Sequence, residues 1–323
     1  MRKPKMSEAP FFNDVARGPE FVNAVWATTD DGITLRTVHW RSKSKSRGTI
    51  FIFQGRSENL EKYGLLANDL VGLGFDLFGI DWRGQGLSDR LTGDRVMGHI
   101  DSYLDYQYDV AAFIEVAEKS DLPKPWLMLA HSMGACIGLR ALVNGVNSFS
   151  CCVLTAPMWG LNIPVWKRFA ARPLARVSLF LNGGSIYAPG GGSECYVMRT
   201  PFTENKLTSD YDMYSYYRSI TEELPEQRIA GPSFGWVYHT MHETGALKYE
   251  PAPNIPCLVL YGAEDQLVSH SAIEAKMARW PRSTTKKIKG ARHDILYEKP
   301  EIRSKAICDI STHFSKCINN EEF

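Results

Sequence analysis

No stretch of this sequence is apolar for long enough to cross a membrane as a helix. Such a helix needs about 20 consecutive apolar residues, and apolar runs such as 49–53 and 257–261 are much shorter. The basic amino terminus is followed by polar Ser7 and Glu8, so we expect no signal peptide. We therefore expect a cytoplasmic protein without a transmembrane span, and we leave open a peripheral contact with the inner face of the membrane.

An excess of charge of either sign is also missing. The 323 residues include 37 Lys and Arg and 36 Asp and Glu, which gives a formal net charge of +1. This balance offers no electrostatic reason to bind nucleic acid, and we expect no nucleic-acid partner.

Cysteine is present, but not in the patterns that disulfides or zinc sites require. There are seven cysteines, an odd number, with no C-x-x-C pair and no histidine-rich cluster. We expect free thiols in a reducing compartment, and we expect Cys151 and Cys152 to pack as small core residues of an apolar strand. No metal or cofactor is expected.

What the sequence does contain is an alternation of short apolar segments with segments of helical spacing. This pattern is typical of an α/β fold with a mostly parallel central sheet and helices on both faces. The first 18 residues are expected to form a loose arm. The predicted strands span 20–28, 34–40, 49–53, 75–80, the run that ends before Ser132, 151–156, 257–261 and 284–288. The predicted helices span 60–73, 103–119, 136–143, 270–280 and 300–316.

One long segment breaks the alternation. Residues 158–241 are rich in aromatic side chains and show no regular exchange of strand and helix. We interpret them as a helical cap, inserted into a core that is formed by residues 1–157 and 242–323. Trp159 and Trp166 of this cap are candidates for the wall of an apolar substrate pocket. The alternative is an irregular excursion whose aromatic residues form a small core of their own.

Ser132 lies in the most informative segment of the chain. An apolar strand, 126–130, runs directly into it, small residues occupy both sides, and a helical run begins at Cys136. This is the arrangement of a nucleophile elbow, in which a tight strand-to-helix turn lifts a serine out of the sheet. Ala130 stands where this turn usually has glycine, and its methyl group makes the turn more crowded.

A serine hydroxyl is a poor nucleophile unless a base and an orienting carboxylate assist it. In an open α/β sheet such groups lie at the carboxyl ends of strands. Asp265 follows the strand 257–261 and is the candidate acid, with Glu264 as its rival. His293 follows the last strand and is the candidate base. The order Ser132, Asp265, His293 is the one expected of an α/β-hydrolase.

The other histidines are weaker candidates for the base. His131 adjoins the serine, but an elbow turns neighbouring side chains apart, so we expect His131 to pack beneath the site. His239, His242 and His270 lie outside the strand ends.

The oxyanion that forms during acyl transfer needs two backbone N–H donors. We expect one from Met133, directly after the nucleophile, and one from Arg56 in the loop after the strand 49–53. Gly55 lets the backbone approach the site closely and is a candidate substrate-binding residue. Because the donor is main chain, the Arg56 side chain remains free to meet a polar head group or to face solvent.

A different interpretation exists for the loop 81–88. Gly84 and Gly86 after a strand faintly resemble a dinucleotide fingerprint, but the third glycine is absent and no convincing helix follows. We expect the loop to support the elbow instead, with Asp81 and Arg83 in local polar contacts.

Together these motifs resemble the lysophospholipase and monoacylglycerol-lipase branch of the α/β-hydrolases. The resemblance covers roughly residues 20–316, and the cap stretches 205–210 and 231–236 resemble bacterial lysophospholipases in particular. Gln54 departs from the family, in which histidine is commonest at that position. The motifs that carry the resemblance are Gln54-Gly55-Arg56-Ser57-Glu58, Asp81-Trp82-Arg83-Gly84-Gln85-Gly86-Leu87-Ser88, the elbow, Tyr261-Gly262-Ala263-Glu264-Asp265 and Gly290-Ala291-Arg292-His293.

The resemblance implies a serine hydrolase that needs no cofactor and cleaves a lysophospholipid or monoacylglycerol through an acyl-enzyme. The aromatic cap is the residue-level argument for an apolar acyl pocket, whereas the lipid class comes from the resemblance. A general carboxylesterase of short-chain esters is the first alternative. A serine aminopeptidase is a second, because Glu194, Glu204 and Asp210 in the cap are available to hold a substrate ammonium group. A binding protein without turnover is a third, which the intact triad disfavours.

Overall fold

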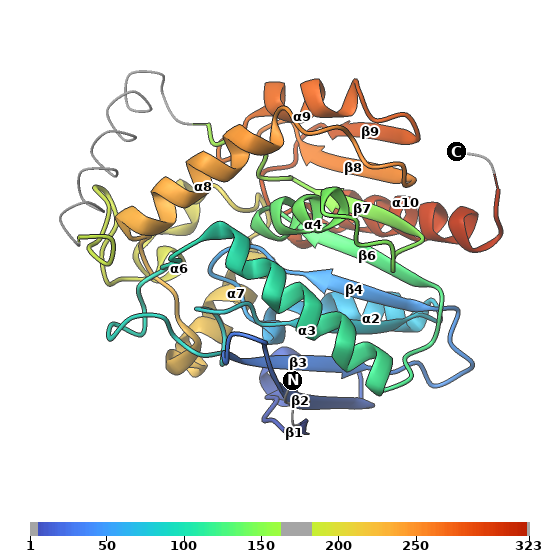
Figure 1. Cartoon of the computed structure of the whole chain (residues 1–323), viewed down its shortest axis with the longest axis horizontal. Coiled ribbons are helices and arrows are strands. Elements are labelled where there is room, and N and C mark those ends of the chain that lie inside the picture. Colours follow the sequence, from blue (N-terminus) through green and yellow to red (C-terminus); the bar gives the residue numbers. More distant parts are fainter. Residues whose placement is uncertain (1–5, 163–182, 322–323) are drawn as a thin grey trace.

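The computed structural model describes residues 6–162 and 183–321. Within these ranges the chain forms one sheet in the order β1-β2-β3-β5-β4-β6-β7-β8-β9 (Figure 1). Strands β4 to β9 run parallel, whereas β1, β2 and β3 are antiparallel and form one edge. The strands are β1 (Ser7–Glu8), β2 (Val22–Thr28), β3 (Thr34–Trp40), β4 (Thr49–Phe53), β5 (Asp76–Ile80), β6 (Trp126–His131), β7 (Cys151–Thr155), β8 (Cys257–Gly262) and β9 (Ser283–Ile288).

The middle strands are covered on both faces, as their uninterrupted apolar sequences require. Every residue of β4, β6 and β7 is buried, whereas the polar strand β9 at the edge is mostly exposed. Because side chains alternate along a strand, Phe51 and Phe53 point into one core, while Ile50 and Ile52 point into the other. The predicted α/β fold with a mostly parallel sheet is confirmed.

Helices cover both faces of this sheet. Helices α3, α4, α8 and α9 contribute side chains to the core around Phe51, and α2, α7 and α10 to the core around Ile52. In Figure 1, α3 and α4 lie in front of the sheet, and α2 and α10 lie behind it. The helices are α1 (Asn13–Ala16), α2 (Gly64–Gly72), α3 (Tyr106–Lys119), α4 (Met133–Val143), α6 (Tyr196–Arg199), α7 (Tyr211–Glu223), α8 (Phe234–Leu247), α9 (His270–Met277) and α10 (Pro300–Ile318).

The amino-terminal segment differs from the loose arm that we expected. From residue 6 onward it is ordered against the sheet: β1 pairs with β2, and Phe11 packs edge-on against Trp40 with 5.6 Å between ring centroids. The physical reason is that the outer edge of β2 offers unpaired backbone N–H and C=O groups, which a short polar segment can satisfy.

The segment between β7 and β8 contains helices and turns and, in its described part, no strand of the sheet. Helices α6, α7 and α8 lie at the left of Figure 1, beside the carboxyl ends of the parallel strands. The division into a cap of residues 158–241 and a core of 1–157 and 242–323 remains a prediction, and helix α8 runs through residue 241. Trp166 lies outside the described residues.

Two compositional expectations can be compared with the structure. No helix in the described part of the chain is long and apolar enough to cross a membrane. All seven cysteines lie in the described ranges, and each is a free thiol. Cys151 and Cys152 are buried in β7, as expected.

Candidate active site

Ser132 occupies the sharp turn between β6 and α4. Its backbone has φ 49° and ψ −111°, a conformation that residues other than glycine rarely adopt and that a nucleophile elbow requires. A Cβ atom added to Gly134 would lie 2.0 Å from the carbonyl oxygen of Phe53. Glycine at this position therefore allows α4 to begin directly against the end of β4.

The structure brings the three predicted triad residues together. His293 Nε2 lies 3.0 Å from Ser132 Oγ, and His293 Nδ1 lies 2.7 Å from Asp265 Oδ2. All three residues are buried, whereas Glu264, the rival acid, is exposed. The geometry therefore favours Asp265 as the carboxylate that orients the histidine.

Backbone donors hold Asp265 in this position. Its Oδ1 accepts hydrogen bonds from the N–H groups of Leu267 at 2.7 Å and Val268 at 3.3 Å. Burial alone would raise the pKa of Asp265, but the contact with His293 and these N–H groups hold that pKa below its usual value. An ionised Asp265 accepts the Nδ1–H of His293 and leaves Nε2 facing Ser132 as a proton acceptor.

The loop after β4 is held on both sides of Arg56. The N–H of Gly55 donates to Glu58 Oε2 at 2.5 Å, and the N–H of Ser57 donates to Gln85 Oε1 at 2.7 Å. These two bonds fix the backbone around the N–H of Arg56, one of the two predicted oxyanion donors.

Met133, the other predicted donor, is the first residue of α4. The N–H of a first helical residue has no acceptor within its own helix and points outward from the helix end. A Cβ at Gly134 would also lie 2.6 Å from Gln54 O, so the start of α4 packs against the loop that carries Arg56. The two donors thus belong to adjoining segments, and their role in catalysis remains a prediction.

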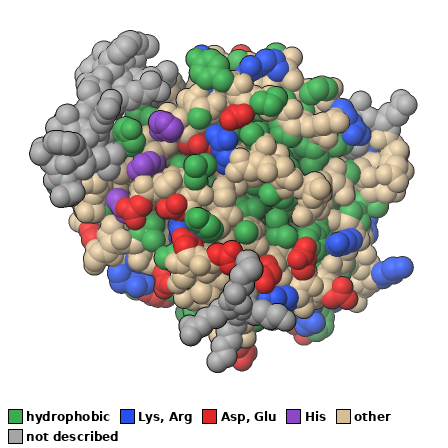
Figure 2. Space-filling view, in the orientation of Figure 1, with side chains coloured by type: hydrophobic (Ala, Val, Ile, Leu, Met, Phe, Trp, Pro, Cys, Tyr) green, Lys and Arg blue, Asp and Glu red, His purple; other side chains and the backbone are tan. Residues whose placement is uncertain are grey.

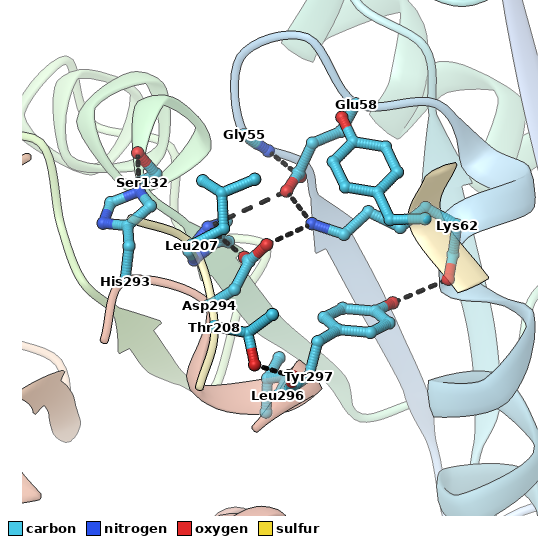
Figure 3. A network of polar contacts seen from close by, with 12 residues as sticks. Gly55, Glu58, Lys62, Ser132, Leu207, Thr208, His293, Asp294, Leu296 and Tyr297 are labelled. Carbon is cyan, nitrogen blue, oxygen red and sulfur yellow. Dashed lines mark hydrogen bonds and ion pairs between the residues drawn. The ribbon is translucent and has the colours of Figure 1, made fainter. Parts of the chain in front are cut away.

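A buried network of charged side chains lies beside the triad (Figure 3). Lys62 Nζ lies 2.5 Å from Glu58 Oε1 and 2.8 Å from Asp294 Oδ2. Asp294 Oδ1 lies 2.9 Å from His131 Nε2, and the rings of His131 and His293 are 4.9 Å apart between centroids. The network therefore connects the Arg56 loop, the elbow and the loop that carries the candidate base.

The network changes the titration of its members. Burial alone would raise the pKa of Asp294, but the charge of Lys62 and the hydrogen bond with His131 hold that pKa well below its usual value. Burial alone would lower the pKa of His131, but the carboxylates of Glu58 and Asp294 raise it above its usual value. A protonated His131 donates to Asp294 and to Thr155 Oγ1, which lies 3.0 Å from its Nδ1.

Glu58, His131 and Asp294 also offer the ligand types of a metal site. Their ligand atoms lie within 4.8 Å of one another. Lys62 Nζ contacts both carboxylates directly, so an ammonium group already supplies the positive charge that a cation would bring. We therefore assign these residues to holding the loops of the site in place.

Comparisons with known proteins identify the family of the chain. Residues 44–300 match the family Hydrolase_4, described as serine aminopeptidase, S33. The chain belongs to this α/β-hydrolase family. It is 31% identical over 297 residues to lysophospholipase L2 of Escherichia coli (strain K12), with 88% of this chain and 85% of that protein covered. It is 24% identical over 304 residues to monoglyceride lipase of Homo sapiens, with 92% and 90% covered.

Solved structures of other α/β-hydrolases share the fold. A soluble variant of monoglyceride lipase from Saccharomyces cerevisiae, in complex with a substrate analog, superposes with a TM-score of 0.70 at 18% identity, covering 98% of this chain and 96% of that one. A highly thermostable carboxyl esterase from Bacillus coagulans, in complex with glycerol, has a TM-score of 0.74 at 17% identity, covering 92% and 99%. The predicted α/β-hydrolase fold is therefore confirmed.

In this hydrolase a cavity of about 460 Å³ is lined by Ser132 and His293 together with side chains of the core and the cap. His131, which we expected beneath the site, lies beside His293 and also borders the cavity. Most of the surface is apolar. Its apolar side chains include Met158, Leu161, Val197, Leu207, Leu224, Ile229, Trp236 and Val268.

Two of the predicted substrate-binding residues, Trp159 and Gly55, do not border this cavity. Trp159 is buried elsewhere and stacks on Trp280, with 6.2 Å between ring centroids, because the two indoles bury each other's apolar faces. Gly55 is buried behind Glu58 and His131, whose atoms would lie 3.0 Å from a Cβ at this position. Trp166 lies outside the described residues.

Asp81 and Arg83 make the local polar contacts that we expected, and the loop 81–88 is bonded to the loop after β4 through Asp81 and Gln85. Asp81 accepts hydrogen bonds from Arg36 Nε at 2.8 Å and from Gln54 Nε2 at 3.1 Å. Arg83 binds Asp109 at 2.7 Å. The side chain of Gln54, which departs from the family pattern, is thus turned toward Asp81 in the interior.

Glu58, Lys62 and Asp294 were not among the site residues predicted from the sequence. Two local signals were available. Asp294 directly follows the candidate base His293, and Glu58 and Lys62 are four residues apart, a spacing at which opposite charges pair. Neither signal shows that the two pairs meet, because Lys62 and Asp294 are 232 residues apart in the chain.

Proposed function

We propose that this hydrolase cleaves carboxylic esters through a covalent acyl-enzyme. The observation that carries the proposal is the hydrogen-bonded series Asp265–His293–Ser132 in the wall of an apolar cavity. A base within hydrogen-bond reach of a serine, itself oriented by a carboxylate, activates the hydroxyl as a nucleophile.

In the proposed reaction, Ser132 Oγ attacks the ester carbonyl while His293 Nε2 takes the hydroxyl proton. The negative oxygen of the tetrahedral intermediate accepts hydrogen bonds from the main-chain N–H groups of Met133 and Arg56. The bond between the acyl carbon and the alcohol oxygen then breaks, and His293 protonates the departing alcohol. A water molecule attacks the acyl-enzyme by the same route and releases the carboxylic acid. Asp265 stabilises the imidazolium that forms in each half.

The proposed substrate is a single-chain lipid ester, either a lysophospholipid or a monoacylglycerol. The largely apolar lining of the cavity suits one acyl chain. The names of the similar proteins, lysophospholipase L2 and monoglyceride lipase, support the same class. We place the enzyme in the cytoplasm, where peripheral contact with a membrane gives access to such lipids. A general carboxylesterase of short-chain esters is the alternative within the same chemistry.

The family description raises a second candidate, a serine aminopeptidase. Such an enzyme needs a carboxylate to hold the ammonium group of its substrate. Among the described residues that border the cavity, Glu58 and Asp294 are paired with Lys62, which leaves Glu194. The two other acids that the sequence suggested do not border the cavity. The cavity therefore suits an ester better than a peptide with a free amino terminus.

A fluorophosphonate probe tests the proposed mechanism. We expect the probe to label the wild-type protein and Ser271→Ala, which removes an exposed hydroxyl of α9, but not Ser132→Ala. Dodecanoyl esters of glycerol and of glycerophosphate should be hydrolysed by the labelled proteins alone. Absence of labelling on folded protein would favour a binding protein without turnover. Cleavage of alanine p-nitroanilide in preference to every ester would favour an aminopeptidase.

A further inference from the structure

The guanidinium group of Arg56 borders the cavity and has no task in the proposed reaction, which uses only the main-chain N–H of this residue. Its Nη2 donates to Ala230 O at 2.7 Å, and its Nη1 donates to Ser57 Oγ at 3.0 Å. Its Nε is buried and has no acceptor among residues 6–162 and 183–321. The ring of Trp236 lies 4.8 Å from the guanidinium carbon. The partners that the structure gives this cation are thus neutral.

In the described part of the chain, the arginines whose side chains are most fully buried are neutralised by carboxylates. Three of them have two carboxylate partners each: Arg36 with Glu61 and Asp81, Arg83 with Asp31 and Asp109, and Arg140 with Glu243 and Glu250. Arg90 has none but donates to four backbone carbonyls, and it does not border the cavity. No carboxylate in the described ranges forms an ion pair with Arg56, and the sequence 163–182 contains neither Asp nor Glu.

The otherwise largely apolar cavity lining contains three further basic side chains. Arg228 borders the same cavity and donates to the backbone carbonyls of Thr221 and Glu222. Arg199 and Lys206 are exposed members of the lining. Against these cations, the described lining offers Glu194 as a carboxylate that is not paired with Lys62. A positive cavity in a chain whose net charge is only +1 indicates an anionic ligand.

The chemical properties of the Arg56 side chain indicate which kind of anion it would bind. Burial lowers the pKa of Arg56 to about 10, which still leaves the group protonated at neutral pH. A desolvated guanidinium with an unused N–H is a strong donor, and its planar fork matches the oxygens of a phosphate. The main-chain N–H of the same residue is proposed to contact the ester carbonyl oxygen. A phosphate a few bonds from the scissile ester, as on glycerol, therefore comes within reach of the side chain.

We propose that Arg56 binds a phosphate in the alcohol half of the substrate, and that Arg228 strengthens the positive field around it. The substrate class is then a single-chain ester whose glycerol carries a phosphodiester, and neutral monoacylglycerols are poorer substrates. The inference rests on the proposed ester hydrolysis and goes further, because it names the head group and the residue that selects it.

The kinetic test compares two esters with the same acyl chain, 1-dodecanoyl-glycero-3-phosphoglycerol and 1-dodecanoylglycerol, both below their critical micelle concentrations. We expect the wild-type kcat/KM to favour the phosphodiester by about tenfold or more, and Arg56→Gln to remove about a tenfold preference. Glutamine keeps the main-chain N–H. Arg228→Gln should lower the preference several-fold, and it is the substitute test if Arg56→Gln does not fold. The matched control Arg41→Gln removes an exposed charge at the opposite end of the sheet and should keep the wild-type preference.

A binding test on Ser132→Ala protein does not depend on turnover. We expect calorimetry to show that dodecyl phosphate binds about tenfold or more tightly than dodecanol, and more tightly than inorganic phosphate. The preference for the phosphorylated ligand should fall when Arg56→Gln is combined with Ser132→Ala.

Several results would overturn the proposal. They are an unchanged substrate preference in Arg56→Gln, an equal loss of preference in Arg41→Gln, and equal binding of dodecyl phosphate and dodecanol. Inorganic phosphate that binds as tightly as dodecyl phosphate would indicate a site for the free ion and would also overturn it. If the wild-type protein cleaves neither ester and the fluorophosphonate does not label Ser132, the proposed function fails, and the binding test still decides the role of Arg56.

Discussion

In the proposed mechanism, the reactivity of Ser132 depends on two neighbouring side chains. His293, within hydrogen-bond distance of Ser132, would take its proton, and Asp265 would hold the imidazole in one tautomer. We expect Ser132→Ala and His293→Ala to lower kcat roughly 10⁴–10⁶-fold, and Asp265→Asn roughly 10⁴-fold. Glu264→Gln alters the exposed neighbour and should leave kcat near the wild-type value. Steady-state kinetics on folded variants checks this, and the reverse order of effects at 264 and 265 would assign the acid to Glu264.

His131 should make the stability of the protein depend on pH. Its folded pKa is raised above the unfolded value of about 6.5, so its stabilising effect is complete below about pH 6.5 and is lost as the pH rises through the folded pKa. His131→Gln removes this titration and should cost about 1–3 kcal/mol of unfolding free energy at pH 6, and less as the pH rises. Urea unfolding from pH 5 to 10 measures the difference between the two proteins.

The contribution of Asp294 to stability should change with pH in the direction opposite to that of His131. Its folded pKa is lowered, so its stabilising effect is present above about pH 4 and is lost as the pH falls through the folded pKa. The cost of Asp294→Asn should therefore stay constant from pH 5 to 6, while the cost of His131→Gln begins to fall above that range. A cost of His131→Gln that is the same at every pH would show that His131 does not titrate in this network.

At the scale of elements, the contact between α4 and β4 sets the geometry of the elbow. A Cβ at Gly134 would meet Phe53 O at 2.0 Å, so Gly134→Ala must move α4 away from the Arg56 loop. We expect kcat to fall about 10²-fold or more, because displacements near 1 Å disrupt catalytic geometry. Gly72→Ala is the matched control in α2, where an added Cβ meets no atom within 4 Å, and it should be neutral or stabilise by about 0.5–1 kcal/mol. The measurements are kcat and thermal unfolding of Gly134→Ala and Gly72→Ala. Equal activity of the two variants would contradict the proposed role of the contact between α4 and β4.

The site residues that follow strand ends are the ones that the sequence predicted best. Ser132 and Asp265 each follow an apolar segment that identifies a strand, and His293 follows the polar edge strand β9. The carboxyl ends of these parallel strands meet at one edge of the sheet. That rule is enough to gather a triad from residues far apart in the chain. The pairing of Ser7 and Glu8 with β2 could not be found in this way, because two polar residues carry no periodic pattern.

Contacts between elements were harder to predict. An aromatic cap indicates apolar surface near the site, but composition does not tell which way a ring turns, and Trp159 faces Trp280 instead of the cavity. Similarly, Lys62 pairs both with Glu58, four residues before it, and with Asp294, which in turn contacts His131 of the elbow. This network depends on how three segments far apart in the sequence approach one another, and local sequence patterns do not encode that.

At the scale of the whole molecule, polar contacts attach the predicted cap to the loops of the candidate base and of the predicted oxyanion donor. The N–H of Asp294 donates to Leu207 O at 2.7 Å, and Thr208 Oγ1 donates to Tyr297 O at 2.6 Å (Figure 3). On another side, Arg56 donates to Ala230 O. The predicted cap is therefore bonded both to the loop of the candidate base and to the loop of the predicted oxyanion donor.

The distribution of charge also becomes clear only at this scale. Acidic and basic residues nearly balance over the chain, and Figure 2 shows them dispersed over one face of the molecule. The balance does not hold in the cavity, where Arg56, Arg228, Arg199 and Lys206 gather. Net charge describes the chain as a whole, so it could not indicate a local site such as the one proposed for a phosphate.

The cavity wall, which residues of the core and of the predicted cap form together, should set the preferred length of the acyl chain. Each buried CH₂ is worth about 0.8 kcal/mol, or about fourfold in kcat/KM, so the rate should climb with chain length until the cavity is full. Leu224→Ala widens the cavity and should move the optimum toward longer chains. Trp159→Ala is the control, because this buried residue does not border the cavity; it should lower stability by about 3–5 kcal/mol and lower all ester rates in proportion. The measurement is kcat/KM for esters from acetate to hexadecanoate on both folded variants, and proportional losses in Leu224→Ala as well would show that the acyl chain lies elsewhere.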